Sequence, residues 1–128
     1  MGDFLFSFHS GWRYLVLLAG VVALALPLIG LRAPTLGNGA LRALRLFTIA
    51  LDVQFLLGIV LLFVRPFFPA LIGHIVMMVS AVALAHLLAV TIRKRPPERR
   101  TPALAATGVG ICLVLIVGGI LAIQRPLI

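Results

Sequence analysis

The stretch YLVLLAGVVALALPLIGL, residues 14–31, runs without a charged side chain and decides the class of this protein. A transmembrane helix needs about 20 predominantly apolar residues, because the hydrocarbon core of a bilayer is roughly 30 Å thick. A secretory signal peptide would begin with basic residues and have a shorter apolar core, whereas Asp3 lies ahead of this stretch. We therefore predict a first transmembrane span over residues 4–31.

Three further apolar stretches are long enough to cross a bilayer. We predict spans over residues 41–64, 70–92 and 102–123, with Thr101 and Pro102 as the cap and first residue of the last one. Since lipid offers no partner to backbone polar groups, each span should be a helix. The predicted fold is all-α, a polytopic membrane protein in which residues 1–128 form one up-and-down bundle of four transmembrane helices.

The composition excludes several classes of protein. The chain has 128 residues, of which 62% are hydrophobic and 11% charged, whereas soluble domains are about half apolar and a quarter charged. A cytosolic enzyme, a secreted disulfide scaffold and a disordered linker are excluded. One cysteine, Cys112, allows no internal disulfide and no Cys-x-x-Cys-His haem attachment. Hydrolase and kinase motifs are absent from the sequence.

The net charge of +8 comes from basic residues that lie mostly between the apolar stretches. This pattern is typical of residues that set the orientation in a membrane, and it does not indicate nucleic-acid binding. Three basic residues fall on one side of the membrane: Arg13, Arg65 and Arg125. Eight fall at the two longer loops on the other side: Arg32, Arg42, Arg45, Arg93, Lys94, Arg95, Arg99 and Arg100. Cytoplasmic loops carry the excess of Lys and Arg. We therefore expect a bacterial inner-membrane protein with both termini on the periplasmic side, and no nucleic-acid partner.

Two histidines are the first candidate site, because polar groups in a membrane are costly and usually functional. At about 1.5 Å per residue, His9 lies roughly 9 Å past Asp3 and His74 roughly 8 Å past Pro69. The two imidazoles are thus nearly level on different helices. Axial ligands must approach a haem from opposite faces, so this arrangement predicts one b-type haem with His9 and His74 as its iron ligands.

Small residues and one cation lie near the same level. Gly58, Gly118 and Gly119 are about 9–11 Å from the outer end and would make room for a flat ring. The alternative is that these glycines let helices pack closely. Arg13, one turn beyond His9, could pair with a haem propionate or a quinone carbonyl, or could anchor in headgroups.

A second polar level is predicted nearer the cytoplasmic side. Asp52 lies seven residues after Arg45 and His86 seven before Arg93, about 10 Å deep in each case. Together with the amide of Gln54, they are candidates for a proton or quinone site. The alternative is a structural polar link between the second and third spans.

The string HSGWRYLVL, residues 9–17, resembles the opening of a family of small bacterial four-helix membrane proteins labelled cytochrome b-like. The segments QFLLG (54–58) and HIVMM (74–78), followed by a further histidine, fit the same family. The resemblance implies that His9, His74 and His86 are haem or polar-site residues. Asp52 stands where relatives tend to have histidine, so a second haem held at that position is not expected.

These features predict a b-type haem protein that passes electrons between the membrane quinol pool and a periplasmic acceptor or partner subunit. We expect an electron-transfer subunit rather than a stand-alone enzyme, with haem b as cofactor and quinone as a second candidate ligand. The alternative is a non-catalytic accessory subunit of a larger respiratory or photosynthetic complex. A small transporter or channel using Asp52 and His86 is a third hypothesis, although no inverted repeat supports it.

Overall fold

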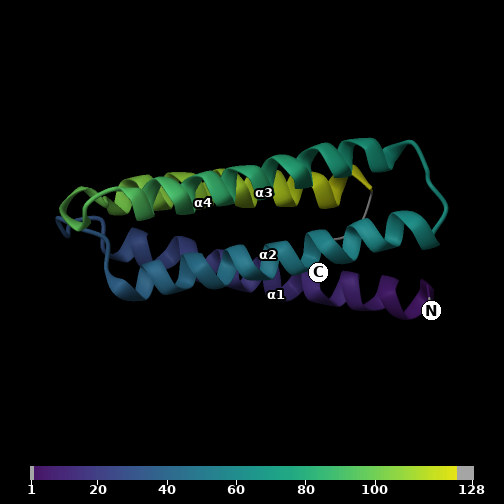
Figure 1. The fold of residues 1–128 in the computed structure, drawn as a ribbon, viewed down its shortest axis with the longest axis horizontal. Helices are drawn as coiled ribbons and strands as arrows, with labels where there is room; N and C mark the ends of the chain where they lie inside the picture. The colour runs from purple at the N-terminus through teal and green to yellow at the C-terminus, as the bar shows by residue number, and fades with distance from the viewer. Residues whose placement is uncertain (1, 124–128) are drawn as a thin grey trace.

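The computed structural model describes residues 2–123 and contains four long helices (Figure 1). They are α1 (Gly2–Ile29), α2 (Asn38–Val64), α3 (Ala70–Lys94) and α4 (Pro102–Ala122), with a short 3-10 helix η1 (Pro97–Arg99) before α4. No strand occurs in this part of the chain. The prediction of an all-α, four-helix membrane protein is confirmed. The helices begin and end within three residues of the predicted spans, and α1 ends at Ile29 rather than at residue 31.

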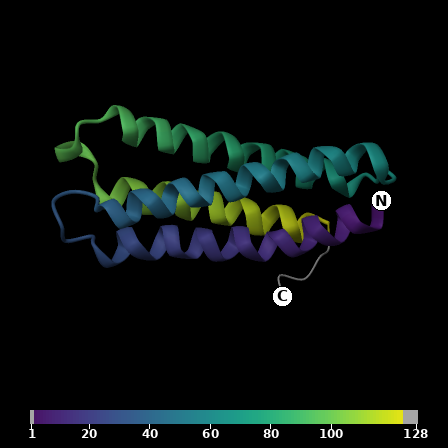
Figure 2. The ribbon, with the colours of Figure 1, turned by 60° about the horizontal axis from the view of Figure 1, so that its bottom comes forward.

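The helices run up and down and associate as two close pairs, α1 with α2 and α3 with α4 (Figure 1). The α1–α2 pair is joined through the indole of Trp12, whose Nε1 donates a hydrogen bond to the Ala50 carbonyl at 2.8 Å. α4 also packs on α1, and α2 meets α3 less closely. Figure 2 shows the same bundle from a second side.

The connections at residues 30–37 and 95–101 lie together at one end of the bundle, opposite the turn at residues 65–69 (Figure 1). The Leu36 amide donates to the Arg100 carbonyl at 2.7 Å and joins the two loops. The Arg100 guanidinium donates to the carbonyls of Arg95 at 3.0 Å and Arg93 at 3.2 Å, at the C-terminal end of α3. The basic residues of both loops are therefore held at the same end.

The start of α4 is capped as the sequence predicts. Thr101 has extended backbone angles, and its hydroxyl accepts a hydrogen bond from the Leu104 amide at 3.3 Å. Pro102 follows at the first helical position, where no amide hydrogen is needed.

Replacing Thr101 with alanine will lower the stability of the bundle, because the Leu104 amide loses its acceptor. The expected cost is about 1 kcal/mol. Thermal unfolding in detergent measures the loss, and amide hydrogen exchange localises it to the first turn of α4. Thr107→Ala, at an exposed position in the second turn of α4, is the control. Equal midpoints for the two variants would contradict the role of the cap.

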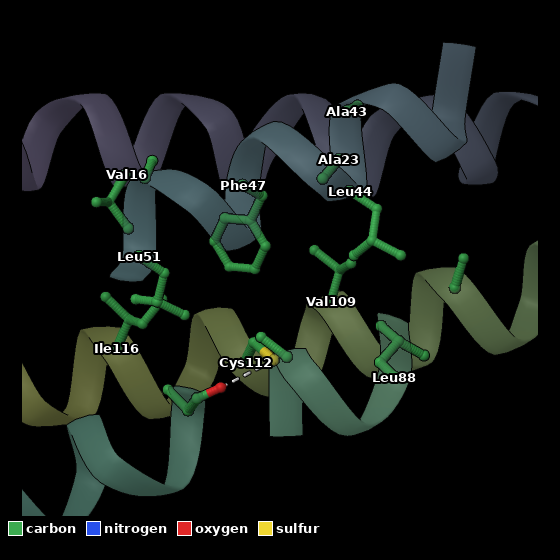
Figure 3. Close-up of a cluster of buried hydrophobic side chains, with 14 of the residues drawn as sticks. Val16, Ala23, Ala43, Leu44, Phe47, Leu51, Leu88, Val109, Cys112 and Ile116 are labelled. Carbon is green, nitrogen blue, oxygen red and sulfur yellow. Dashed lines mark hydrogen bonds between the residues drawn. The ribbon is translucent and has the colours of Figure 1, made fainter. Parts of the chain in front are cut away.

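Most of the apolar core lies in the half of the bundle nearest the two loops, and Ile116 and Ile120 of α4 extend it toward the other end. Every buried residue of α2 falls between Ala40 and Leu51, and every buried residue of α3 between Ala81 and Ile92. Phe47 is the largest fully enclosed side chain. The Cys112 thiol, also enclosed, donates to the Ala81 carbonyl at 3.7 Å (Figure 3). The far halves of α2 and α3 therefore have no closed core between them.

The outer surface of the bundle is apolar on all four helices. Leu18, Phe63, Leu87 and Val114 are each more than half exposed, at 61%, 85%, 63% and 71%. All four helices are long and apolar enough to cross a membrane. Such a surface is unfavourable in water and suits the hydrocarbon of a lipid bilayer. The protein is a multi-pass membrane protein.

Candidate functional site

A cavity of about 600 Å³ lies between α2 and α3, in the half of the bundle that has no closed core. The volume is within the range of roughly 300–1,000 Å³ that is common for small-molecule and cofactor sites. Its walls come mostly from α2 and α3, with a contribution from α1 and from the turn at residues 65–69. The lining is apolar except for four polar side chains, His9, Gln54, Arg65 and His74.

Both histidines predicted as ligands line this cavity, His9 from α1 and His74 from α3. His9 lies beside Gly58 of α2: a Cβ atom at Gly58 would be 3.4 Å from the His9 Cε1. Gly58 also lines the cavity, as the sequence analysis expects of a residue that makes room for a ligand. The structure thus brings His9, His74 and Gly58 together at one site.

The imidazole of His74 is oriented by α4. Its Nδ1 lies 2.8 Å from the Gly119 carbonyl oxygen. α4 ends at Ala122, so this carbonyl belongs to the last turn, where the intrahelical partners run out. Because a carbonyl oxygen can only accept, Nδ1 carries the hydrogen, and Nε2 of the neutral ring keeps its lone pair. A hydrogen bond of this kind is the usual support of a histidine that ligates a metal.

Gly118 and Gly119 have a different place from the one predicted. They lie against Met77 and Met78 of α3 and outside the cavity lining: a Cβ atom at Gly119 would be 2.9 Å from the Met78 Cε. Their small size lets α3 and α4 pack closely, which is the alternative that the sequence left open. Gly119 takes part in the site through its carbonyl group instead.

Arg13 lies beside the cavity rather than in it. Its Nη2 donates to the Tyr14 hydroxyl at 2.8 Å, and its guanidinium carbon lies 4.8 Å from the centre of that ring. Arg13 lines an adjoining hollow of about 50 Å³, which His9, Gln54 and His74 also line. Arg13 does not line the larger cavity.

Gln54 belongs to the cavity and not to the second polar level. Its Nε2 donates to the His9 backbone carbonyl at 3.0 Å, so the amide fixes α1 against α2 at the site. Its Oε1 is buried and has no hydrogen-bond partner among residues 2–123. Asp52, two residues earlier on the same helix, faces away from it, because residues i and i+2 do not share a helix face.

Arg65 lies at the site but was not predicted there. From the sequence it was assigned only a role in setting membrane orientation. It follows the last residue of α2 and lines the cavity. Its guanidinium carbon lies 4.3 Å from the centre of the Phe6 ring, and its Nη1 is 3.2 Å from the Asp3 carboxylate, which is fully exposed. A signal was present, because Arg65 is seven residues after Gly58 and therefore shares its helix face.

Asp52 and His86 meet at the second polar level. The His86 Nε2 and Asp52 Oδ1 atoms are 2.7 Å apart and link α2 to α3. The pair is open to the surroundings, with 49% of the His86 side chain and 39% of the Asp52 side chain exposed. Neither residue lines the cavity, although their neighbours Leu51 and Val82 do.

The donor set fits a haem better than a bare metal ion. Within residues 2–123, no three His, Cys, Asp or Glu side chains are close enough together to hold a metal. A haem brings its own four ring nitrogens and needs only axial ligands from the protein. Two imidazoles on one cavity, of which His74 has its tautomer fixed, meet that need.

Comparison with known proteins adds no relative: no family model, curated protein or solved structure matches the chain.

Proposed function

We propose that this protein is a cytochrome b-like membrane protein that holds one b-type haem through His9 and His74. The observation that carries the proposal is the cavity that both imidazoles line from different helices. The hydrogen bond from His74 Nδ1 to the Gly119 carbonyl supports it, because it leaves Nε2 as the metal-binding atom.

The other lining residues have separate parts in this proposal. The apolar side chains of α2 and α3, among them Phe55, Ile75 and Met78, exclude water and pack on the flat faces of a macrocycle. Arg65 supplies the positive charge for the haem carboxylates, in place of the predicted Arg13. A bound haem supplies one-electron chemistry at its iron, with a potential set by axial ligands and burial.

We further propose that the electrons pass between membrane quinol and a periplasmic acceptor or partner subunit. The cavity lies at the end of the bundle opposite the two basic loops. If those loops are cytoplasmic, as the excess of Lys and Arg indicates, the cavity faces the periplasmic side of a bacterial inner membrane. Arg125, one of the three basic residues assigned to that side, lies outside the described residues.

A pyridine haemochrome assay on the purified protein tests the cofactor. The protein is produced with added 5-aminolevulinate so that haem supply is not limiting. We expect a b-type spectrum and a haem-to-protein ratio near one. A folded, colourless protein under these conditions would remove the proposal.

The second candidate function is an accessory subunit of a larger respiratory or photosynthetic complex. It is favoured by the short connections, residues 30–37, 65–69 and 95–101, which leave almost no mass outside the membrane for a soluble partner. Co-purification with a large membrane complex, without one haem per chain, would favour this function over the first.

A further inference from the structure

The Asp52–His86 pair lies in an unusual environment for two ionisable groups. Asp52 is near the middle of α2, about 20 Å from either end, and His86 is about 12 Å from the C-terminal end of α3. Ionisable side chains within a membrane usually face the interior of the bundle. Here both are partly exposed, and their exposed neighbours Leu56 and Leu87 are apolar. The pair therefore faces the hydrocarbon of the bilayer.

The contact with Asp52 uses one of the two ring nitrogens of His86. Nε2 lies 2.7 Å from Asp52 Oδ1, so Nδ1 is the nitrogen left for a further partner. The pair has no net charge either as an imidazolium beside a carboxylate or as a neutral imidazole beside a carboxylic acid. In both of these arrangements Nδ1 carries a hydrogen and is an N–H donor.

This donor has no acceptor within residues 2–123, where the single hydrogen bond of the His86 side chain is the one to Asp52. An N–H group left without an acceptor in hydrocarbon is unfavourable. Its partner must therefore be soluble in the bilayer and carry an acceptor oxygen. A quinone, with carbonyl groups on an apolar ring, has this chemistry.

We propose that Asp52 and His86 bind the head group of a membrane quinone, with His86 Nδ1 donating a hydrogen bond to a quinone carbonyl. The head group would lie on the bilayer side of the contact between α2 and α3. Leu51 and Val82, which adjoin the pair, line the haem cavity from the other side. This inference rests on the proposed function and deepens it, since it names the residues that bind the quinone, but quinone binding does not need haem and is measured separately.

The test uses haem-free protein, labelled with ¹⁵N-histidine, in phosphatidylcholine nanodiscs. Oxidised decylubiquinone is added and the imidazole resonances of His9, His74 and His86 are followed. We expect a saturable shift of His86 Nδ1, with affinity about tenfold weaker in Asp52→Asn, which corresponds to the loss of one good hydrogen bond. Asp52→Glu should keep most of the affinity. Ser80→Ala, an exposed polar position on α3, should leave it unchanged.

Three results would overturn the proposal. The first is the absence of a saturable shift with decylubiquinone, as when a second copy of the chain covers the pair. The second is equal affinity for decylubiquinone in Asp52→Asn and in the native protein. The third is a His86 Nδ1 shift on changing from ester-linked to ether-linked lipid without quinone, because the donor would then serve a lipid ester carbonyl. Failure of the haem assay leaves each of these readouts unaffected.

Discussion

Replacing His74 with alanine will abolish stoichiometric haem binding, and His9→Ala will do the same. Each variant loses one of the two imidazoles that line the cavity. Removing a residue that hydrogen-bonds to a metal ligand typically weakens metal affinity by about 10- to 100-fold. Loss of the ligand itself should therefore weaken haem affinity by more than about 100-fold. The Soret absorbance per mole of purified protein measures the result.

The matched control is His86→Ala, which removes the third histidine from a place outside the cavity lining. It should retain the haem. A second readout separates ligation from structural support: added imidazole should restore the spectrum of His74→Ala by entering the space of the lost ring. Full haem content in either His9→Ala or His74→Ala would show that the iron is held differently.

Replacing Phe47 with alanine will cause the largest loss of stability in the bundle. This side chain is 0% exposed and lies among side chains of α1, α2 and α4 (Figure 3). Truncation leaves a cavity that a well-packed core fills only in part, at a cost of about 3–5 kcal/mol in soluble proteins. Packing also drives helix association in membranes, so the same physical term applies. The thermal midpoint in detergent should fall sharply.

Phe63→Ala is the control for this variant, since Phe63 lies on the same helix and is 85% exposed. It removes the same atoms from the lipid-facing surface and should change the midpoint little. Similar midpoints for the two variants would contradict the location of the core in the half of the bundle nearest the loops.

Span number, span boundaries and depth were predictable from the sequence. An up-and-down bundle brings its helix ends to two common planes, so counting residues from the ends gives the depth of each side chain. That reasoning placed His9 level with His74 and Asp52 level with His86. In the structure His9 and His74 line one cavity. The His86 Nε2 and Asp52 Oδ1 atoms are 2.7 Å apart.

The face of each helix was not predictable in the same way. Apolar residues surround these helices on every side, so no polar stripe marks which side meets a neighbour. Gly118 and Gly119 have the expected depth but face α3. Gln54 faces the cavity and not Asp52.

The uneven packing of the bundle bears on how the protein matures. The half nearest the loops is closed by its own buried side chains, whereas the opposite half of α2 and α3 borders the cavity. Under the proposed function, haem would fill this second half after the helices have associated. Its entry would then require only local separation of α2 from α3, and not unfolding of the chain.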